Sequence, residues 1–497
     1  MKRVAAIDIG TNSIHMIVAE MLDDGYRVID REKDSIQLGL DSLDGAPLTA
    51  GAIRRGVASL ERMRQIAEGW EAGEIIAVAT SAVREAPNQS EFLRRVRERA
   101  GINVRVISGE EEARLIYRAV RASVELENKT ALCVDVGGGS VEIIVGTGEH
   151  LHFARSEPLG ALRLAQRYEL LDFADAENIN GCRAFVRKKL RRSEKSVRAL
   201  DADVCVATSG TALALVSLAR AGRRGTARGL RRLRRDDVAN AVQTLTKTSR
   251  DERVEQFGFD RKRAQTIVAG AVVIDEVMDV FDIDSLIVCP AAIREGILES
   301  LMSGTRDSVR RASVLALARR MHCDMRHGDH VAELAGCLFD GLADEFALRH
   351  AGREILEYAS LLHETGMHIS ERGHDRHTDY IVRHGDLKGF TEEQIATVAS
   401  VARFYRINPP EDWRDAAHEL NAKQRLEAQK LTAILRVADG LDRGHRQRVR
   451  DIRVSAVDGE VTIELHTRGD ASVEIESAKK RAKYFREVFG TKLRISE

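Results

Sequence analysis

The sequence is poor in cysteine, carries no net charge and contains no long apolar segment, and each absence excludes a class of protein. The six cysteines include no Cys-x-x-Cys pair. Cys133, Cys205 and Cys289 lie in apolar, strand-like runs. Buried, reduced thiols in a cytoplasmic protein are therefore the simplest interpretation.

The charge balance and the hydropathy pattern limit the partners that we expect. The 77 basic and 77 acidic side chains give a formal net charge of zero, which argues against a nucleic-acid partner. No apolar run approaches the roughly 20 residues that a membrane-spanning helix needs, and the N-terminus leads directly into a strand. We expect a cytoplasmic protein without a targeting segment and without a nucleic-acid or membrane partner.

Length and periodicity predict several domains. A chain of 497 residues exceeds a single hydrophobic core. Strands and helices alternate up to about residue 300, which is typical of an α/β fold, and long amphipathic helices follow from about residue 306. We predict two similar α/β domains over residues 1–125 and 126–305, a helical domain over 306–450, and a small α+β domain over 451–497.

The last of these domains has its own pattern. The segment "DIRVSAVDGEVTIELHT" predicts a β-hairpin around Asp458-Gly459. A basic helix is expected to follow, from about Ser477 to Phe489. This region therefore forms a small α+β tail.

One pattern occurs twice in the α/β region. "IDIGTNSIHMIV" runs from Ile7 to Val18, and "VDVGGGSVEIIV" runs from Val134 to Val145. Each copy predicts a buried strand, a tight turn and a second strand, with an Asp near the turn. A carboxylate beside a core is unfavourable without a partner, so we expect these Asp side chains to have a function.

The two turns differ in composition. The first contains Thr11, Asn12 and Ser13, whereas the second contains Gly137, Gly138 and Gly139. Three glycines leave the backbone amides bare, which suits the close approach of a phosphate. If the two hairpins face each other, they form a cleft with Mg²⁺-binding carboxylates and phosphate-binding amides on both walls.

Four further segments combine a strand or turn with a helix start. "TSAVREAPN" places Arg84 at the start of a helix. In "ISGEEEARLIY", a capping box explains Ser108 and Glu111, but it does not explain the third carboxylate, Glu112. "ATSGTALAL" and "CPAAIREGIL" repeat the scheme of strand, turn and helix. Each segment alone has an ordinary structural explanation, and their joint occurrence in this order is what favours a function.

In this order the segments resemble the exopolyphosphatase/guanosine pentaphosphate phosphohydrolase (Ppx/GppA) family of the actin-like ATPase and sugar-kinase superfamily. The residues that carry the resemblance are "AAIDIGTNSIHMIV", "AVATSAVREAPN", "VISGEEEARLIY", "CVDVGGGSVEIIV", "VATSGTALAL" and "PAAIREGIL". The helical region, with "LLHETG" and "LRVADGLDR", is similar to an HD-type domain. The resemblance implies an α/β fold of two actin-like (ribonuclease-H-like) domains, an all-α HD-like domain and a small α+β tail.

The resemblance also assigns roles. It makes Glu112 the general base, with Asp135 and Glu142 as carboxylates that hold Mg²⁺ and position water, and Asp8 as a further metal ligand on the facing hairpin. Attack of water on a terminal phosphoryl group depends on charge neutralisation and positioning, which these residue types supply. The implied phosphate-binding residues are Asn12, Ser13, Arg84, Gly137, Gly138, Gly139, Ser140, Ser209, Gly210 and Thr211.

The HD-like region departs from the pattern of a metal-dependent hydrolase. His327, His363 and Asp439 stand at plausible ligand positions, but the expected His-Asp doublet is His363-Glu364. His368, His374 and His377 follow, and Tyr405 stands where a further His is expected. We therefore predict no independent hydrolase here, while metal binding by the histidines stays open.

The predicted function is Mg²⁺-dependent, processive hydrolysis of the terminal phosphoanhydride of inorganic polyphosphate by a homodimer. Two basic runs, Arg183–Arg198 and Arg220–Arg235, suit either a solvated surface or a polyanion. A nucleotide-dependent kinase or ATPase is disfavoured because no Gly-Gly adenosine loop is evident between Gly210 and Gly296. Hydrolysis of pppGpp to ppGpp and a non-catalytic sensor of polyphosphate or an alarmone are the alternatives.

Overall fold

The computed structural model describes residues 2–22, 25–126, 128–220, 230–302, 309–407, 413, 417–457 and 460–496. The chain divides into two compact units. Residues 1–223 and 230–306 belong to the first, and residues 307–497 to the second. The first unit contains both copies of the repeated hairpin.

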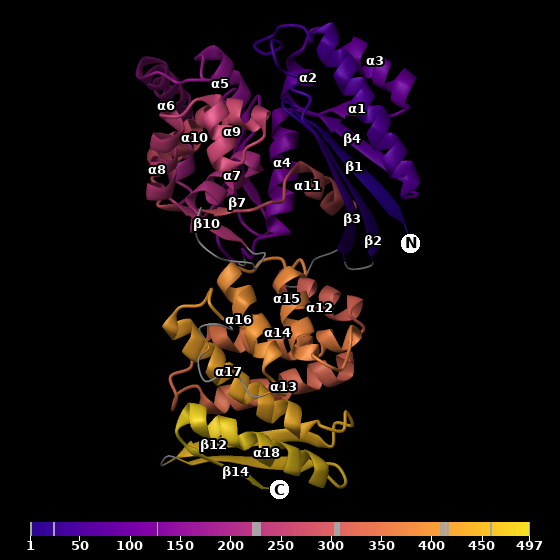
Figure 1. Cartoon of the computed structure of the whole chain (residues 1–497), viewed down its shortest axis with the longest axis vertical. Coiled ribbons are helices and arrows are strands. Elements are labelled where there is room, and N and C mark those ends of the chain that lie inside the picture. Colours follow the sequence, from indigo (N-terminus) through magenta and orange to yellow (C-terminus); the bar gives the residue numbers. More distant parts are fainter. Residues whose placement is uncertain are drawn as a thin grey trace. The chain divides into compact units, whose positions relative to one another are not determined.

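A five-stranded sheet forms the first half of the first unit (Figure 1). Its strand order is β3-β2-β1-β4-β5, in which β1 pairs with β2 and β2 with β3 antiparallel, whereas β1, β4 and β5 are parallel. The strands are β1 (Arg3–Ile9), β2 (Ile14–Leu22), β3 (Gly25–Asp34), β4 (Glu74–Ala79) and β5 (Val104–Val106).

A six-stranded sheet repeats this plan in the second half. Its order is β10-β11-β9-β6-β7-β8, with β6, β7 and β8 antiparallel, β6, β9 and β11 parallel, and β10 antiparallel to β11. The strands are β6 (Ala131–Val136), β7 (Val141–Gly146), β8 (Leu151–Glu157), β9 (Val204–Thr208), β10 (Arg231–Arg234) and β11 (Ser285–Val288). The repeated sequence pattern therefore reflects a repeated hairpin, β1–β2 and β6–β7.

Helices cover the outer face of each sheet. Outside the first sheet lie α1 (Ala50–Gly69), the short α2 (Ser81–Glu85) and α3 (Gln89–Ala100), whose apolar residues pack on β1, β2 and β4. The helices that pack with the second sheet are α5 (Ala161–Arg167), α6 (Ala176–Arg198), α7 (Ser209–Ala219), α8 (Arg235–Thr246), α9 (Arg250–Phe257) and α10 (Arg261–Phe281).

Two helices share a third core between the sheets. Helix α4 (Gly109–Arg121) comes from the first half but packs on β6, β7 and β8, and α11 (Ile293–Ser300) comes from the second half but packs on β1 and β2. Figure 1 shows both helices in the middle of the first unit. They meet at Gly296, where a Cβ would lie 2.6 Å from the carbonyl carbon of Leu115. The packing therefore does not follow the domain boundaries drawn at residues 125 and 305.

The second unit begins with helices. They are α12 (Val309–Arg320), α13 (Met325–Leu342), α14 (Ala351–Leu362), the 3₁₀ turn η1 (Thr365–His368), α15 (His374–His384), α16 (Glu392–Arg403) and α17 (Ala422–Leu441). Their apolar faces form one core with the C-terminal strands.

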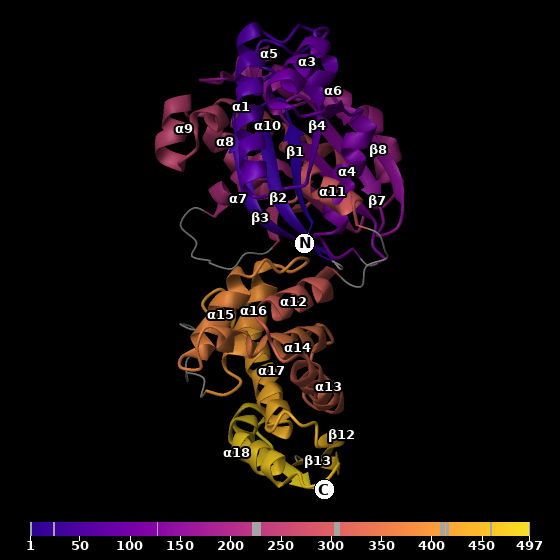
Figure 2. The same cartoon turned by 90° about the vertical axis from the view of Figure 1, so that its right-hand side faces the viewer.

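The C-terminal part contains one strand more than the sequence predicts. Strands β12 (Val449–Val457) and β13 (Glu460–Thr467) form the expected antiparallel pair, and β14 (Lys492–Ser496) adds to β13 in parallel. Figure 2 shows β12, β13 and α18 (Ser472–Phe489) at the C-terminal end of α17. The helix begins before the predicted Ser477, because Glu474 favours a helix N-terminus. Asp458 and Gly459 lie outside the described residues.

No described helix is both long and apolar enough to cross a membrane.

Candidate active site

The two hairpin turns have the same backbone hydrogen bond. In the first, the amide of Gly10 donates to the carbonyl of Ser13 over 3.1 Å, and in the second the amide of Gly137 donates to the carbonyl of Ser140 over 3.0 Å. The expectation of three bare glycine amides is therefore wrong for Gly137, whose amide closes the turn. Among the described residues, the amides of Gly138 and Gly139 have no acceptor.

The turns also pack directly against each other, as the facing-hairpin prediction requires. A Cβ added at Gly138 would lie 3.1 Å from the Cβ of Thr11, and one added at Gly139 would lie 2.6 Å from Thr11 Oγ1. Real Cβ atoms essentially never approach other atoms that closely, so Gly139 is required for this packing. The glycines thus serve the contact between the two halves as well as any phosphate.

Asp135 and Glu142 stand opposite each other on β6 and β7. Directly opposed side chains share one face of a sheet, so both carboxylates lie on the same side. Thr208 Oγ1 donates to Asp135 Oδ1 over 2.5 Å, and Ser156 Oγ donates to Glu142 Oε1 over 2.7 Å. Glu142 is fully buried, and its Oε2 has no partner among the described residues.

Glu112 lies in the first turn of α4. The Ser108 side chain accepts from the amide of Glu111, which is half of the predicted capping box. The Glu111 side chain pairs with Arg105 instead of completing the box. Glu110 and Glu111 form surface ion pairs with arginines, whereas Glu112 is only 4% exposed. Arg84 Nη1 donates to Glu112 Oε2 over 2.9 Å. The helix that Ser108 caps therefore places the Glu112 carboxylate inward, where Arg84 binds it.

Burial makes these acids hard to ionise together. It raises the pKa of Glu112 to about 7 against the lowering effect of Arg84, and it raises the pKa of Asp8 to about 7. Burial also raises the pKa of Asp135, and burial with the charges of Glu112 and Asp135 raises that of Glu142 well above its ordinary value. We call Asp8, Glu112, Asp135 and Glu142 the carboxylate cluster.

A pocket of about 420 Å³ adjoins this cluster. Its polar lining contains two arginines, two serines and two glutamates, and of these Arg84 and Ser156 bind Glu112 and Glu142. Arginine binds phosphate oxygens strongly, while Glu85 and Glu110 balance the charge of Arg84 and Arg155 in this lining. The lining residues are Arg84, Glu85, Gly109, Glu110, Ser140, Ala154, Arg155, Ser156 and Pro158.

Comparison with known families identifies the chain. The family model for the Ppx/GppA phosphatase family matches residues 17–304, and that for Ppx/GppA phosphatase domain III matches residues 309–474. The chain belongs to the Ppx/GppA phosphatase family. The resemblance inferred from its motifs is thus confirmed.

Solved structures agree with this assignment. An exopolyphosphatase from Cytophaga hutchinsonii is 26% identical, with a TM-score of 0.58 over 61% of this chain and 99% of the other. The Aquifex aeolicus member of the Ppx/GppA family is 28% identical, with a TM-score of 0.51 over 60% of this chain and 97% of the other. The predicted fold is confirmed as the actin-like Ppx/GppA fold with a helix-rich C-terminal portion.

The structure places the remaining predicted phosphate-binding residues of this family member in different ways. Asn12 Oδ1 is buried without a partner among the described residues, whereas the hydroxyl of Ser13 lies 3.3 Å from that of Ser35. Ser209 adopts a positive φ of 87°, and its Oγ accepts from the amide of Thr211. Phosphate contacts by these residues and by Gly210 stay predictions.

The carboxylate cluster fits Mg²⁺. Asp8 Oδ1 and Glu142 Oε2 are buried carboxylate oxygens without partners in the described part of the chain. Mg²⁺ prefers such oxygens, and it is typically bound by one or two carboxylates together with water and substrate phosphate. Among the described residues, no three acids of the cluster have ligand atoms within 4.8 Å of one another. This spacing suits an ion bound by one or two carboxylates and water rather than one enclosed by protein ligands alone.

Sequence reasoning missed several basic residues near Asp8 and His15. Arg294 adjoins both Asp8 and His15, and burial together with Arg294, Lys33 and Arg263 lowers the pKa of His15 to about 3. Arg294 lies within the quoted "PAAIREGIL", so that motif could have indicated it. Lys33 on β3 and Arg263 on α10 stand in no motif.

Arg163 is another buried cation that the sequence did not indicate. It is 3% exposed, and its Nε donates to the carbonyl of Gly139 over 2.7 Å. Its Nη2 donates to Glu85 over 2.8 Å, and a further contact reaches Asp44. Arg163 therefore ties the glycine turn of the second half to the first half. An arginine in an ordinary helical pattern gives no sequence signal for this role.

The basic run over Arg183–Arg198 has a structural role in the described residues. Arg183 and Arg187 bind Glu276 on α10 over 2.8 Å, and Arg198 donates to the carbonyl of Val280. These bonds attach α6 to α10. Of the second run, Arg220–Arg235, residues 221–229 lie outside the described residues, and Arg231–Arg234 form β10.

Proposed function

We propose that this Ppx/GppA phosphatase is an exopolyphosphatase that removes the terminal phosphoryl group of inorganic polyphosphate with Mg²⁺. The observation that carries the proposal is the buried Glu112, which is bound to Arg84 and lies beside Asp8, Asp135 and Glu142. Arg84 and Arg155 also line the adjoining pocket. Water attack on a phosphoryl group needs a base, charge neutralisation and positioning.

Glu112 is the general base in this proposal. Its raised pKa of about 7 matches that of a base that works near neutral pH. Arg84 holds Oε2, so that the carboxylate has one orientation and its other oxygen can take the proton of the attacking water. Arg84 thus acts as a positioning residue and also lines the pocket.

Asp8, Asp135 and Glu142 would hold Mg²⁺, one or two of them directly and the rest through its water molecules, and the bound ion would supply positive charge to the phosphoryl oxygens. Thr208 and Ser156 orient Asp135 and Glu142 through the hydrogen bonds described above. The unpaired amides of Gly138 and Gly139 would donate to the phosphate. Each of these roles belongs to residues that fold from the two repeated hairpins and the strands beside them.

The choice of polyphosphate rests on the character of the surroundings. The lining of the described pocket includes no aromatic side chain on which a base could stack. Lys33, Arg263 and Arg294 gather around His15 near Asp8, and cations in series suit a chain of phosphates. The exopolyphosphatase from Cytophaga hutchinsonii has a similar structure. The predicted homodimer and cytoplasmic location stay predictions.

The test is phosphate release by the full chain with Mg²⁺, measured side by side on long-chain polyphosphate, pppGpp and ATP. We expect release mainly from polyphosphate. Glu112→Gln should lower kcat by roughly 10²–10⁴-fold, the usual contribution of a general base. Glu111→Gln is the matched control, because Glu111 lies in the same helical turn but binds Arg105 at the surface.

Other results would change the assignment. Release mainly from pppGpp, lost in Glu112→Gln, would move the protein to pppGpp hydrolysis with the same chemistry. No release from any substrate while polyphosphate is still bound would make it a sensor. Equal rates for wild type and Glu112→Gln would remove Glu112 from the role of base.

A further inference from the structure

Three helices of the second unit bring two histidines and an aspartate together. His327 lies on α13, His363 directly follows α14, and Asp439 lies on α17. Their exposed fractions are 2%, 1% and 0%. One ligand atom from each lies within 4.8 Å of the other two. We call this set the histidine cluster, and it lies outside the carboxylate cluster of the proposed phosphatase site.

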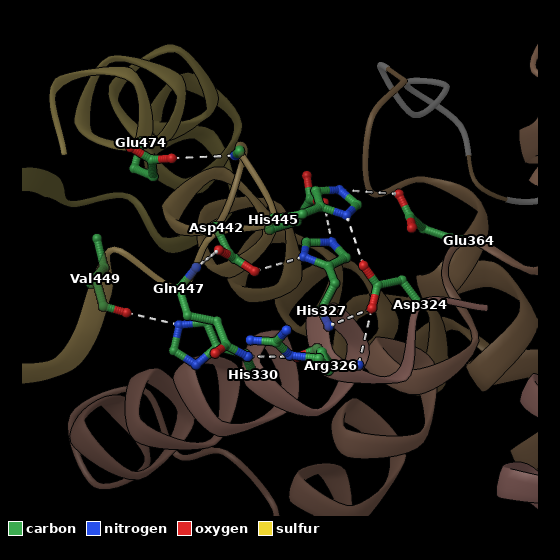
Figure 3. Close-up of polar contacts among 12 residues, drawn as sticks. Asp324, Arg326, His327, His330, Glu364, Asp442, His445, Gln447, Val449 and Glu474 are labelled. Atoms are coloured by element: carbon green, nitrogen blue, oxygen red, sulfur yellow. Dashed lines mark hydrogen bonds and ion pairs between the residues drawn. The ribbon is translucent and has the colours of Figure 1, made fainter. Parts of the chain in front are cut away.

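The hydrogen bonds of the two rings fix where their protons are. His363 Nδ1 lies 2.5 Å from the carbonyl oxygen of Ser360, which can only accept, so Nδ1 carries the proton. His327 Nδ1 lies 2.8 Å from Asp442 Oδ2, a carboxylate that likewise accepts (Figure 3). In the neutral form of each ring, Nε2 therefore presents a lone pair.

These lone pairs face an anion. His327 Nε2 and His363 Nε2 each lie 3.5 Å from Asp439 Oδ1. All three atoms are buried without a hydrogen-bond partner among the described residues. Three acceptors that converge without a donor are unfavourable in a buried site, and a cation between them removes the conflict.

Two arginines near Asp439 do not remove it. Arg481 binds the other oxygen, Oδ2, and leaves Oδ1 unpaired. Arg406 lies 3.6 Å from Oδ1, but it also binds Glu364 over 3.2 Å, and in the described residues it donates to neither histidine. The two Nε2 atoms thus still lack a partner.

A second set of possible ligands is less suitable. His327 also forms a group with Glu364 and His445. Figure 3 shows His445 above the His327 ring, with a stacking distance of 3.7 Å. Glu364 is engaged by Arg406, and His445 lies 3.4 Å from Asp324. The Glu364 carboxylate is therefore already paired with an arginine, and the His445 side chain is 32% exposed, whereas the three residues of the histidine cluster are buried.

We propose that His327, His363 and Asp439 bind one divalent transition-metal ion of the zinc class. Two imidazoles and a carboxylate suit Zn²⁺, Co²⁺ or Mn²⁺ better than Mg²⁺ or Ca²⁺, which prefer oxygen ligands alone. The Ser360 carbonyl and the Asp442 carboxylate hold the Nδ1 atoms, the usual support for metal-bound histidines. Three protein ligands leave a position open for water or an anion.

The test is titration of the full chain with Co²⁺ in excess Mg²⁺, followed by visible absorption, with Zn²⁺ competition measured by calorimetry. We expect one equivalent of Co²⁺ with the bands of a tetrahedral or five-coordinate site, displaced by one equivalent of Zn²⁺. His363→Ala and Asp439→Asn should each weaken binding by roughly 100-fold or more. Circular dichroism checks that both variants fold.

Two controls place the ion. His322 and His368 stack on each other in the same unit and are exposed, so the double variant H322A/H368A should bind as the wild type does. Glu142→Gln, in the carboxylate cluster, should also bind Co²⁺ unchanged. The proposal is overturned if wild type binds no Co²⁺ in excess Mg²⁺, or if either control variant loses binding. If His363→Ala or Asp439→Asn does not fold, His327→Gln takes its place and should weaken Co²⁺ binding in the same way. The number of Co²⁺ ions bound by wild type tests the proposal independently of any variant.

Discussion

The carboxylate cluster of the first unit and the histidine cluster of the second both contain buried polar atoms without hydrogen-bond partners among the described residues. They differ in charge. Burial raises the pKa of Asp8 to about 7, because an ionised carboxylate is poorly solvated there. Burial lowers the pKa of His363 to about 3, so that this ring stays neutral.

The difference shows what each cluster needs from a cation. The carboxylates repel one another when ionised, so a cation would relieve both poor solvation and repulsion. The His363 ring is neutral, and Asp439 is already bound by Arg481, so a cation there would mainly satisfy lone pairs. The same Asp→Asn substitution should therefore have opposite effects on stability in the two clusters.

The largest effect on stability is expected for Asp439→Asn. It leaves Arg481 buried without its partner, and breaking such a pair lowers the free energy of unfolding by about 3–5 kcal/mol. Urea denaturation in the presence of EDTA measures this value. Asp340→Asn is the matched control, because Asp340 pairs with Arg353 at the surface and should change stability by less than about 1 kcal/mol. A stabilised Asp439→Asn variant would contradict the contrast between the clusters.

Asp8→Asn should instead stabilise the metal-free chain, and more so as the pH rises. Asp8 has a folded-state pKa of about 7 and an ordinary value of 3.8, so its protonated form favours the folded state below pH 4. This stability is lost as the pH rises through 7. The gain in unfolding free energy of Asp8→Asn over wild type should therefore grow by about 3 kcal/mol between about pH 5 and about pH 8.

Urea denaturation of both proteins in EDTA at several pH values tests this expectation. Saturating Mg²⁺ should reverse the sign, because wild type gains binding energy that the variant lacks. A gain that does not depend on pH would mean that Asp8 is not a strained acid in the folded chain.

The sequence predicted the parts of the first unit that depend on local pattern. Both hairpins and the Ser108 cap follow from residues close together in the chain, whereas Glu112 was singled out by the family resemblance. The sequence did not predict that α4 would pack on the sheet of the second half and α11 on the sheet of the first half. The apolar face of an amphipathic helix does not indicate which of two sheets it covers. Arg163 was missed for a similar reason, since its partner Glu85 lies 78 residues away in the chain.

In the second unit, the departure from the expected His-Asp doublet limited what the sequence could predict. His327, His363 and Asp439 were predicted as candidate ligands, but the His363-Glu364 doublet spoke against a hydrolase. Only the coordinates show that Glu364 binds Arg406 while the other three present unpaired atoms to one another. The third C-terminal strand, β14, was missed because five residues at a chain end give little periodicity.

The smallest predicted effect concerns Ser156, which distinguishes metal support from substrate contact in the carboxylate cluster. Its hydroxyl donates to Glu142 Oε1 over 2.7 Å, and the residue also lines the pocket. If its main role is to orient Glu142, Ser156→Ala should raise the Mg²⁺ concentration for half-maximal activity about tenfold, as loss of such support commonly does. The value of kcat at saturating Mg²⁺ should stay nearly the same. A raised KM for polyphosphate at unchanged Mg²⁺ dependence would instead assign Ser156 to the substrate, and Glu142 would then depend on the protein fold alone for its orientation.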